Sequence, residues 1–146
     1  MAQKRMRRSE ILANELREAA GKLTRRLRAE SADQAHSMSQ TAVLARLHND
    51  GPLTVSELAR AEHVKPQSMG ATVASLEEER LVARKPDPKD ARCWKASITE
   101  HGKEVLLAGR AARQAWLARA LEENLDETEQ RQLLEATSLL KRVLEG

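Results

Sequence analysis

Aromatic residues are nearly absent from this sequence, which has two Trp and no Phe or Tyr among its 146 residues. Proteins that bind single-stranded nucleic acid usually stack bases on several aromatic side chains, so the composition argues against that class. Apolar residues still make up 40% of the chain, which is enough for a folded domain. Its core must therefore be built from Leu, Val, Ala and Ile.

Cysteine occurs once, as Cys93, so the chain cannot form an intrachain disulfide and has too few thiols for a zinc finger. No apolar run approaches the roughly 20 residues of a membrane span, and the basic stretch 1–8 is not followed by the apolar segment of a secretory signal. We therefore expect a cytoplasmic protein that contacts no membrane.

Catalytic and metal-binding patterns are also missing. The six glycines are isolated, so no glycine-rich phosphate loop is present. The histidines are too scattered for a pair of metal ligands on one helix turn: His36, His48, His63 and His101. We expect no enzyme, no catalytic residue, no metal and no cofactor.

Helical periodicity is present at both ends of the chain. Between residues 9 and 30, apolar side chains recur at spacings of three and four, and a polar break follows at 31–37. Near the C-terminus, Thr99 is expected to cap one helix, and Asp126 with Glu129 resembles the capping box of another. Such long terminal helices have little inner domain to cover, so we expect them to pack against each other or against a second subunit.

The middle of the chain predicts three shorter helices. The first is expected to begin at Ser39 as N-cap, to bury Val43, Leu44 and Leu47, and to stop before 49–52. The second follows Thr54 or Ser56 as N-cap, with Leu58 and Ala59 facing inward, and Val64 is expected to plug the turn after it. Pro66 suits the first turn of the third helix, whose apolar face is Met69, Val73 and Leu76.

The opposite face of that third helix carries small or polar residues: Gln67, Ser68, Ala71 and Ser75. Two short helices joined by a tight turn, the second polar on its outer face, are typical of a helix-turn-helix. Gln and Ser can read base edges in a major groove about 12 Å wide. From the helices alone, an ordinary helical hairpin is an equal alternative.

A charged β-hairpin is predicted directly after these helices, from strands at 81–85 and 93–98 around the irregular segment 86–92. The net charge of the chain is only +3, so the distribution of charge carries the argument. Cations gather on the hairpin: Arg84, Lys85, Lys89, Arg92 and Lys95. Such a wing could follow the DNA backbone or enter a narrow minor groove, whereas the charge run by itself would favour a solvated turn.

These segments resemble the MarR family of bacterial transcription regulators. The motifs are L-T-V-S-E-L-A (53–59), a reading helix opened by Pro66, L-E-E-E-R-L-V (76–82), D-P-K-D-A-R (87–92) and I-T-E-H-G-K (98–103). The resemblance implies a mainly α fold with a small β-hairpin wing, with a winged helix-turn-helix at 36–99 and a helical dimerisation region formed by 1–35 and 100–146. It also implies a ligand-responsive repressor that binds a pseudo-palindromic double-stranded operator as a homodimer.

The sequence departs from the family pattern in two places. Ala91 stands where the wing commonly has Arg, and Gly70 and Ala71 stand where many members have Thr and Arg. Both changes remove potential DNA contacts, which leaves a protein-interaction module as an alternative. The expected DNA contacts are Gln67, Ser68 and Thr72 near bases, and Lys65, Arg84, Lys89 and Arg92 near phosphates or the minor groove.

The resemblance also implies an inducer, often a small aromatic anion. Arg17, Arg46 and His48 could pair with its carboxylate, whereas Trp116 is expected in the core rather than against a ligand. Cys93 lies near the cations Arg92 and Lys95, which favour a thiolate, so a redox-responsive regulator is a second alternative. A small residue in a strand is the simpler interpretation of Cys93.

Overall fold

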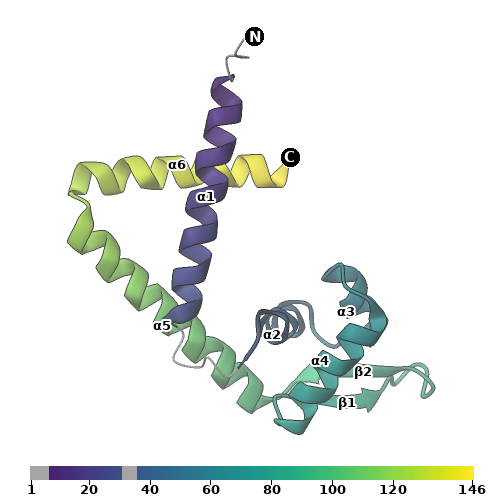
Figure 1. The fold of residues 1–146 in the computed structure, drawn as a ribbon. Helices are drawn as coiled ribbons and strands as arrows, with labels where there is room; N and C mark the ends of the chain where they lie inside the picture. Colours follow the sequence, from purple (N-terminus) through teal and green to yellow (C-terminus); the bar gives the residue numbers. More distant parts are fainter. Residues whose placement is uncertain (1–6, 31–35) are drawn as a thin grey trace. The chain divides into compact units, whose positions relative to one another are not determined.

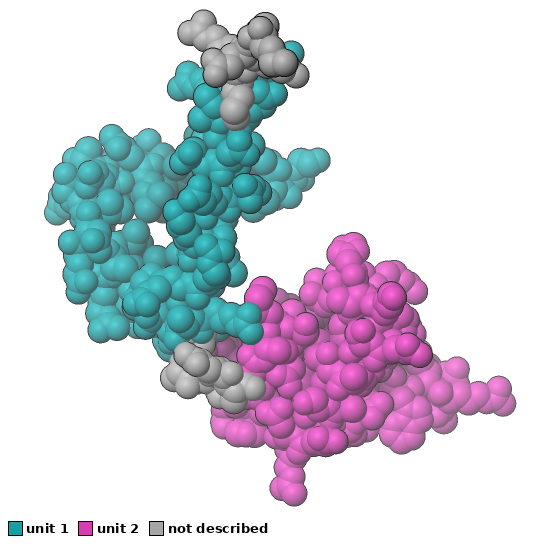
Figure 2. Space-filling view, viewed as in Figure 1, with its two compact units in different colours: residues 1–30, 112–146 teal, residues 31–111 magenta. Residues whose placement is uncertain are grey.

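The computed structural model describes residues 7–30 and 36–146 (Figure 1). The described residues form six helices and two strands: α1 (Arg8–Ala29), α2 (Met38–Asp50), α3 (Val55–Ala61), α4 (Pro66–Glu78), β1 (Val82–Pro86), β2 (Trp94–Ile98), α5 (Glu100–Asn124) and α6 (Glu127–Glu145). The predicted fold class, mainly α with a two-stranded hairpin, is confirmed. The chain divides into two compact units, residues 1–30 with 112–146, and residues 31–111 (Figure 2).

The second unit contains the apolar core. Within it, α2 packs against α4 and β2, and α4 packs against α3 and β1. The predicted inward faces of the three short helices are confirmed, since all their members are buried. The core consists of Val43, Leu44, Leu47, Leu58, Ala59, Met69, Val73, Leu76, Leu81, Val82, Ala96 and Leu106. Burial of each large aliphatic side chain stabilises the fold by about 1.5–3 kcal/mol.

Most of the predicted helix caps are confirmed. The hydroxyl of Thr54 accepts a hydrogen bond from the backbone N–H of Glu57 at 3.1 Å, and Thr99 accepts one from Gly102 at 3.0 Å. Asp126 accepts one from the N–H of Glu129 at 2.8 Å, which completes the expected capping box at α6. These bonds satisfy backbone donors that a helix start otherwise leaves without partners.

The predicted bounds of α2 are wrong at both ends. Ser37 is the N-cap, because Gln40 three residues later completes a capping box with it, whereas Ser39 lies inside the first turn. Asp50 is still helical, and the helix ends at Gly51, whose φ of 81° leads the chain out. Of the polar break expected at 31–37, residues 31–35 lie outside the described part of the chain.

The β-hairpin is antiparallel, with a register that runs from Val82 opposite Ile98 to Pro86 opposite Trp94. Both strands lie within one residue of the predicted ranges. Leu53 pairs with Ala96 on the free edge of β2 through bonds of 3.0 and 2.7 Å. At Ala96, β2 is therefore flanked by β1 on one side and by Leu53 on the other, while the outer half of the hairpin extends beyond the core.

Val64 does not plug the turn between α3 and α4, because 41% of its surface is exposed. The turn is made instead by the backbone. His63 adopts a positive φ of 53°, and the N–H of Val64 then bonds to the carbonyl oxygen of Ala59 at 3.0 Å. This geometry directs the Val64 side chain to the rim of a surface cavity rather than into the core.

The first unit has apolar faces that its own residues leave uncovered. Neither α1 nor α6 contains a buried residue. The large apolar side chains exposed on them are Ile11, Leu12, Leu16, Leu23, Leu133, Leu134, Leu139, Val143 and Leu144. Trp116 is only half-buried, and the Arg26 guanidinium lies 5.2 Å from its ring centroid, so a cation rather than an apolar core covers it. None of the helices in the described ranges is long and apolar enough to cross a membrane.

Candidate nucleic-acid interface

Helix α4 presents the surface that the sequence predicts for base reading. Lys65, Gln67, Ser68 and Ala71 are exposed around its first two turns. The side chains of Gln67 and Ser68 make no hydrogen bond to any residue of the described ranges, so their polar atoms are open to an external partner. Thr72 is half-buried, and its hydroxyl donates to the carbonyl oxygen of Ser68 at 3.1 Å. Thr72 can therefore offer mainly its methyl group and hydroxyl lone pairs.

Ser75, predicted on the same outer face, faces α2 instead. The side-chain amide of Gln40 donates to the Ser75 hydroxyl at 3.1 Å and to the Glu79 carboxylate at 3.2 Å. His36 adds a bond of 2.7 Å between its Nε2 and that carboxylate. The C-terminal half of α4 is thus fixed to α2 by polar contacts, a role that its sequence pattern did not reveal.

The turn before α4 is fixed by an ion-pair network on α2. Arg46 donates from Nε to Glu62 at 2.9 Å, and its second contact is to Asp50 at 3.3 Å. The hydrogen bond that Arg46 donates to the Glu62 carboxylate is the main reason that the pKa of Arg46 is raised above its ordinary value. Glu62 is the C-cap of α3, so the Arg46–Glu62 contact fixes the turn between α3 and α4 to α2. The start of α4 is thereby held in place.

Two of the five hairpin cations are neutralised within the fold. Arg84 pairs with Glu77 of α4, Nε to Oε2, at 2.7 Å. Lys95 pairs with Asp87 at 2.8 Å, and this contact raises the pKa of Lys95 and lowers the pKa of Asp87. The Lys95–Asp87 pair also offsets a like-charge contact, because Lys95 stands directly opposite Lys85 in the sheet.

The tip of the hairpin has an ordered backbone made by its two carboxylates. Asp87 accepts a hydrogen bond from the backbone N–H of Lys89 at 2.8 Å, and Asp90 accepts one from that of Arg92 at 3.0 Å. Asp side chains commonly stabilise turns in this way. The two Asp residues of the D-P-K-D-A-R segment are thus the sequence feature that indicates this turn. The side chains of Lys89 and Arg92 are exposed and form no ion pair with other described residues.

The tip also contains Cys93, which is half-buried. Its carbonyl oxygen accepts from the N–H of Asp87 at 2.7 Å, and its own N–H donates to the carbonyl oxygen of Asp90 at 2.9 Å. Its backbone therefore closes the tip. Within the described ranges, no cluster of His, Cys, Asp or Glu could hold a metal ion.

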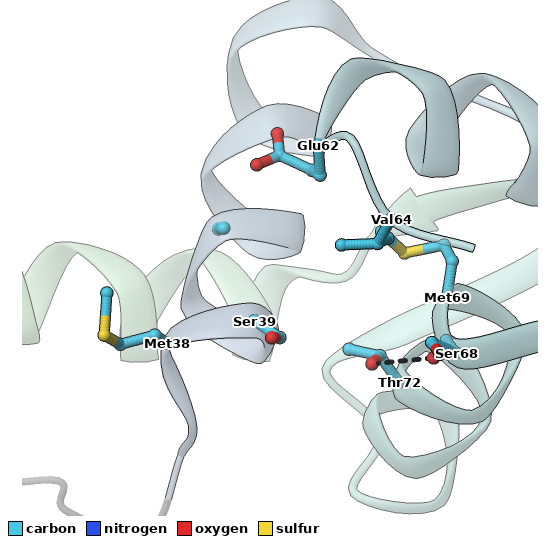
Figure 3. Close-up of a pocket in the computed structure, with 8 residues that line it drawn as sticks. Met38, Ser39, Glu62, Val64, Ser68, Met69 and Thr72 are labelled. Carbon is cyan, nitrogen blue, oxygen red and sulfur yellow. Dashed lines mark hydrogen bonds between the residues drawn. The ribbon is translucent and has the colours of Figure 1, made fainter. Parts of the chain in front are cut away.

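A surface cavity of about 240 Å³ lies beside the exposed face of α4 (Figure 3). It is lined by Met38, Ser39, Ala42, Glu62, Val64, Ser68, Met69 and Thr72. None of the predicted ligand residues is among them: Arg17 belongs to the first unit, Arg46 is engaged by two carboxylates, and His48 lies near the end of α2. Ser68 and Thr72 are shared by the cavity and the predicted base-reading set.

Known proteins of similar sequence and structure identify the family. The model of the MarR family matches residues 36–94. The helix-turn-helix transcriptional regulator Mb0904 of Mycobacterium bovis is 41% identical over 110 residues, 75% of this chain and 77% of that protein. The repressor MdtR of Bacillus subtilis is 39% identical over 82 residues, 54% of this chain and 53% of its own. A crystal structure of a transcriptional regulator from Pseudomonas aeruginosa has a TM-score of 0.86 at 35% identity, with 97% of this chain and 99% of that chain covered. The chain thus belongs to the MarR family of helix-turn-helix transcriptional regulators.

Proposed function

We propose that this chain is a transcriptional repressor that binds a pseudo-palindromic operator as a homodimer, with α4 in the major groove and the hairpin tip at the adjacent minor groove. One observation carries the proposal. A single compact unit presents open hydrogen-bonding groups on a braced helix, Gln67 and Ser68, together with exposed cations on an ordered tip, Lys89 and Arg92. The first pair has the chemistry of base edges and the second has the chemistry of phosphates.

The homodimer is supported by the uncovered apolar faces of α1 and α6. Exposed leucines occur on both helices, such as Leu12 at 64%, Leu134 at 69% and Leu144 at 77%, and this much exposed apolar side-chain surface is typical of an interface. The dimerisation region is proposed to consist of residues 1–35 and 100–146. In a two-fold dimer the two reading helices would address half-sites about one helical turn apart, and the protein would act in the cytoplasm, where it meets the chromosome.

Repression is supported by the name of the Bacillus subtilis relative MdtR. An inducer would be a ligand that binds the DNA-free conformation more tightly. The cavity beside α4 contains the Glu62 carboxylate and no cationic lining residue, so it suits a neutral apolar molecule better than an anion. An aromatic anion as inducer is still a prediction. Release of the operator on addition of a simple aromatic carboxylate, such as benzoate, would support it.

The test of DNA binding begins with selection of duplexes from a random pool. On the selected operator, we expect Arg92→Ala to weaken binding to all duplexes and to lower the slope of log affinity against log salt by about 1, because one phosphate contact is lost. Gln67→Ala should weaken binding by about 1–3 kcal/mol and relax the preference at one base pair.

Lys22→Ala is the matched control for loss of a cation, because Lys22 is exposed on α1 and its ion pair among the described residues is with Glu18. It should leave both the salt slope and the sequence preference unchanged. Failure of the unmodified protein to bind any duplex at low salt would refute the proposed function. Equal losses at every sequence for Arg92→Ala and Gln67→Ala would refute the division of roles between tip and helix.

A further inference from the structure

The hairpin carries an exposed aromatic side chain that none of the expected contacts includes. Trp94 is the first residue of β2, and 56% of its surface is exposed. Its indole Nε1–H has no hydrogen-bond acceptor among the described residues. Trp is a large apolar group with one polar donor, and such a side chain is among the most frequent binding anchors at interfaces. Trp94 therefore has both an apolar surface and a donor available for a partner.

Strand alternation places Trp94 on one face of the hairpin. Residues two apart in a strand share a face, so Trp94 lies on the face of Ala96, which is 1% exposed in the core. Pro86 stands directly opposite Trp94 and shares that face, whereas Lys85 and Lys95 form an opposite pair on the other. This face also carries Arg84, which stands opposite Ala96 and pairs with Glu77. It begins in the core and continues outward to Pro86 and Trp94, which the described residues leave exposed.

The charge around Trp94 indicates what this surface would bind. Residues 84–95 contain five cationic and two acidic side chains. Both acidic groups are occupied by the hairpin itself, since Asp87 binds Lys95 and the N–H of Lys89, and Asp90 binds the N–H of Arg92. The exposed cations thus retain a net positive field beside an apolar ring. A DNA backbone offers the complement, phosphate charges alternating with apolar deoxyribose.

We propose that Trp94 is a DNA-contacting residue of the wing: its ring packs on a deoxyribose beside the groove that Arg92 enters, and its Nε1–H donates to a phosphate oxygen. This inference rests on the proposed function. Trp94 would then supply a DNA contact at a tip where Ala91 stands in place of the Arg that is common in the family pattern. An indole N–H is neutral, so this contact adds affinity without displacing a counterion.

The first experiment uses the fluorescence of Trp94 itself. The chain has only two tryptophans, so Trp116→Phe leaves Trp94 as the sole reporter and keeps a ring beside Arg26. Without DNA, we expect acrylamide to quench Trp94 efficiently, because the ring is exposed. Saturation with the selected operator duplex should protect it several-fold. Protection that is already complete in the DNA-free dimer, or no change on DNA saturation, would overturn the inference.

The second experiment separates the ring from the cations. Trp94→Ala should weaken operator binding about tenfold, as loss of an interface anchor does, with an unchanged salt slope. Trp94→Phe should recover part of this loss, because it keeps the apolar ring without the donor. Arg92→Ala in parallel should lower the salt slope by about 1. The Phe variant and the fluorescence measurement do not depend on whether the Ala variant folds.

The outcomes distinguish this inference from the proposed function. If the protein binds its operator and Arg92→Ala lowers the salt slope, but Trp94→Ala binds as tightly as the parent, the inference fails and the proposed function stands. If the parent binds no duplex, the proposed function fails first. A reduced salt slope in Trp94→Ala would also contradict the inference, since it would mean that the substitution displaced a cationic contact.

Discussion

Two glycines in helices, Gly102 and Gly70, should respond in opposite directions to the same substitution. A Cβ added at Gly102 would lie 2.2 Å from the carbonyl oxygen of Leu81 and 2.8 Å from Cγ1 of Ile98. A Cβ added at Gly70 would meet no atom within 4 Å. Both positions are helical, Gly102 in the first turn of α5 and Gly70 in α4, so replacement by Ala favours the helix at each, and the contact made by the added methyl group is the main difference.

The structure sets the size of both effects. Ala is favoured over Gly in a helix interior by about 1 kcal/mol, and Gly70→Ala should gain approximately that. At Gly102 the added methyl must displace the Leu81 carbonyl by about 1 Å, and overpacking of this kind costs about 1–3 kcal/mol or more. That carbonyl also accepts the Thr99 N–H at 3.0 Å, so its displacement weakens the start of α5. We expect Gly102→Ala to lose about 2 kcal/mol overall.

The assay is thermal unfolding followed by circular dichroism, at one protein concentration because dimerisation changes the apparent stability. For a chain of this size, 1 kcal/mol shifts Tm by about 3 °C. Gly70→Ala should raise Tm by about this amount, and Gly102→Ala should lower it by about twice as much. A Tm for Gly102→Ala equal to or above that of the parent would refute the argument from close approach. A loss at Gly70 comparable to that at Gly102 would show that backbone freedom, not contact, governs both.

Two further predictions concern the helix-turn-helix and the wing. Thr54→Ala should destabilise the fold by about 1 kcal/mol in urea denaturation, because it removes the α3 cap. Ser56 is exposed, and its hydroxyl makes no hydrogen bond within the described ranges, so Ser56→Ala should change stability by less than about 0.5 kcal/mol. Similar losses in both variants would contradict the cap assignment. The contribution of the Asp87–Lys95 pair to the stability of the wing should be complete between the ordinary pKa values of its partners, 3.8 and 10.5, because the pKa of Asp87 is lowered and that of Lys95 is raised. The contribution is lost as pH falls through the lowered pKa of Asp87 or rises through the raised pKa of Lys95. The Tm difference between the parent and Asp87→Asn should therefore be constant inside that window and shrink beyond it, and a difference that does not depend on pH would rule out this ion pair as its source.

The local features of the fold could be predicted because they depend on residues a few positions apart. Spacings of three and four place Met69, Val73 and Leu76 on one helix face, and the structure buries all three. The caps at Thr54, Thr99 and Asp126 follow from side chains that reach backbone donors three residues later. Ser37 and Ser39 are both acceptable caps, and only the position of Gln40 decided between them. The strands of the hairpin were predictable to within one residue for the same local reason.

Contacts between elements required the tertiary structure. Arg84 and Lys95 are formally cations of the wing, yet Glu77 and Asp87 neutralise them, because the register and the packing of β1 on α4 decide which charges meet. Ser75 faces Gln40, 35 residues away, and Val64 is exposed because a backbone bond closes its turn. By itself the sequence determined the family, the element order and the apolar faces, which depend on local periodicity and recognisable motifs. Which side chains stay exposed and available to a partner, Trp94 among them, depended on residues distant in the chain and was decided only by the fold.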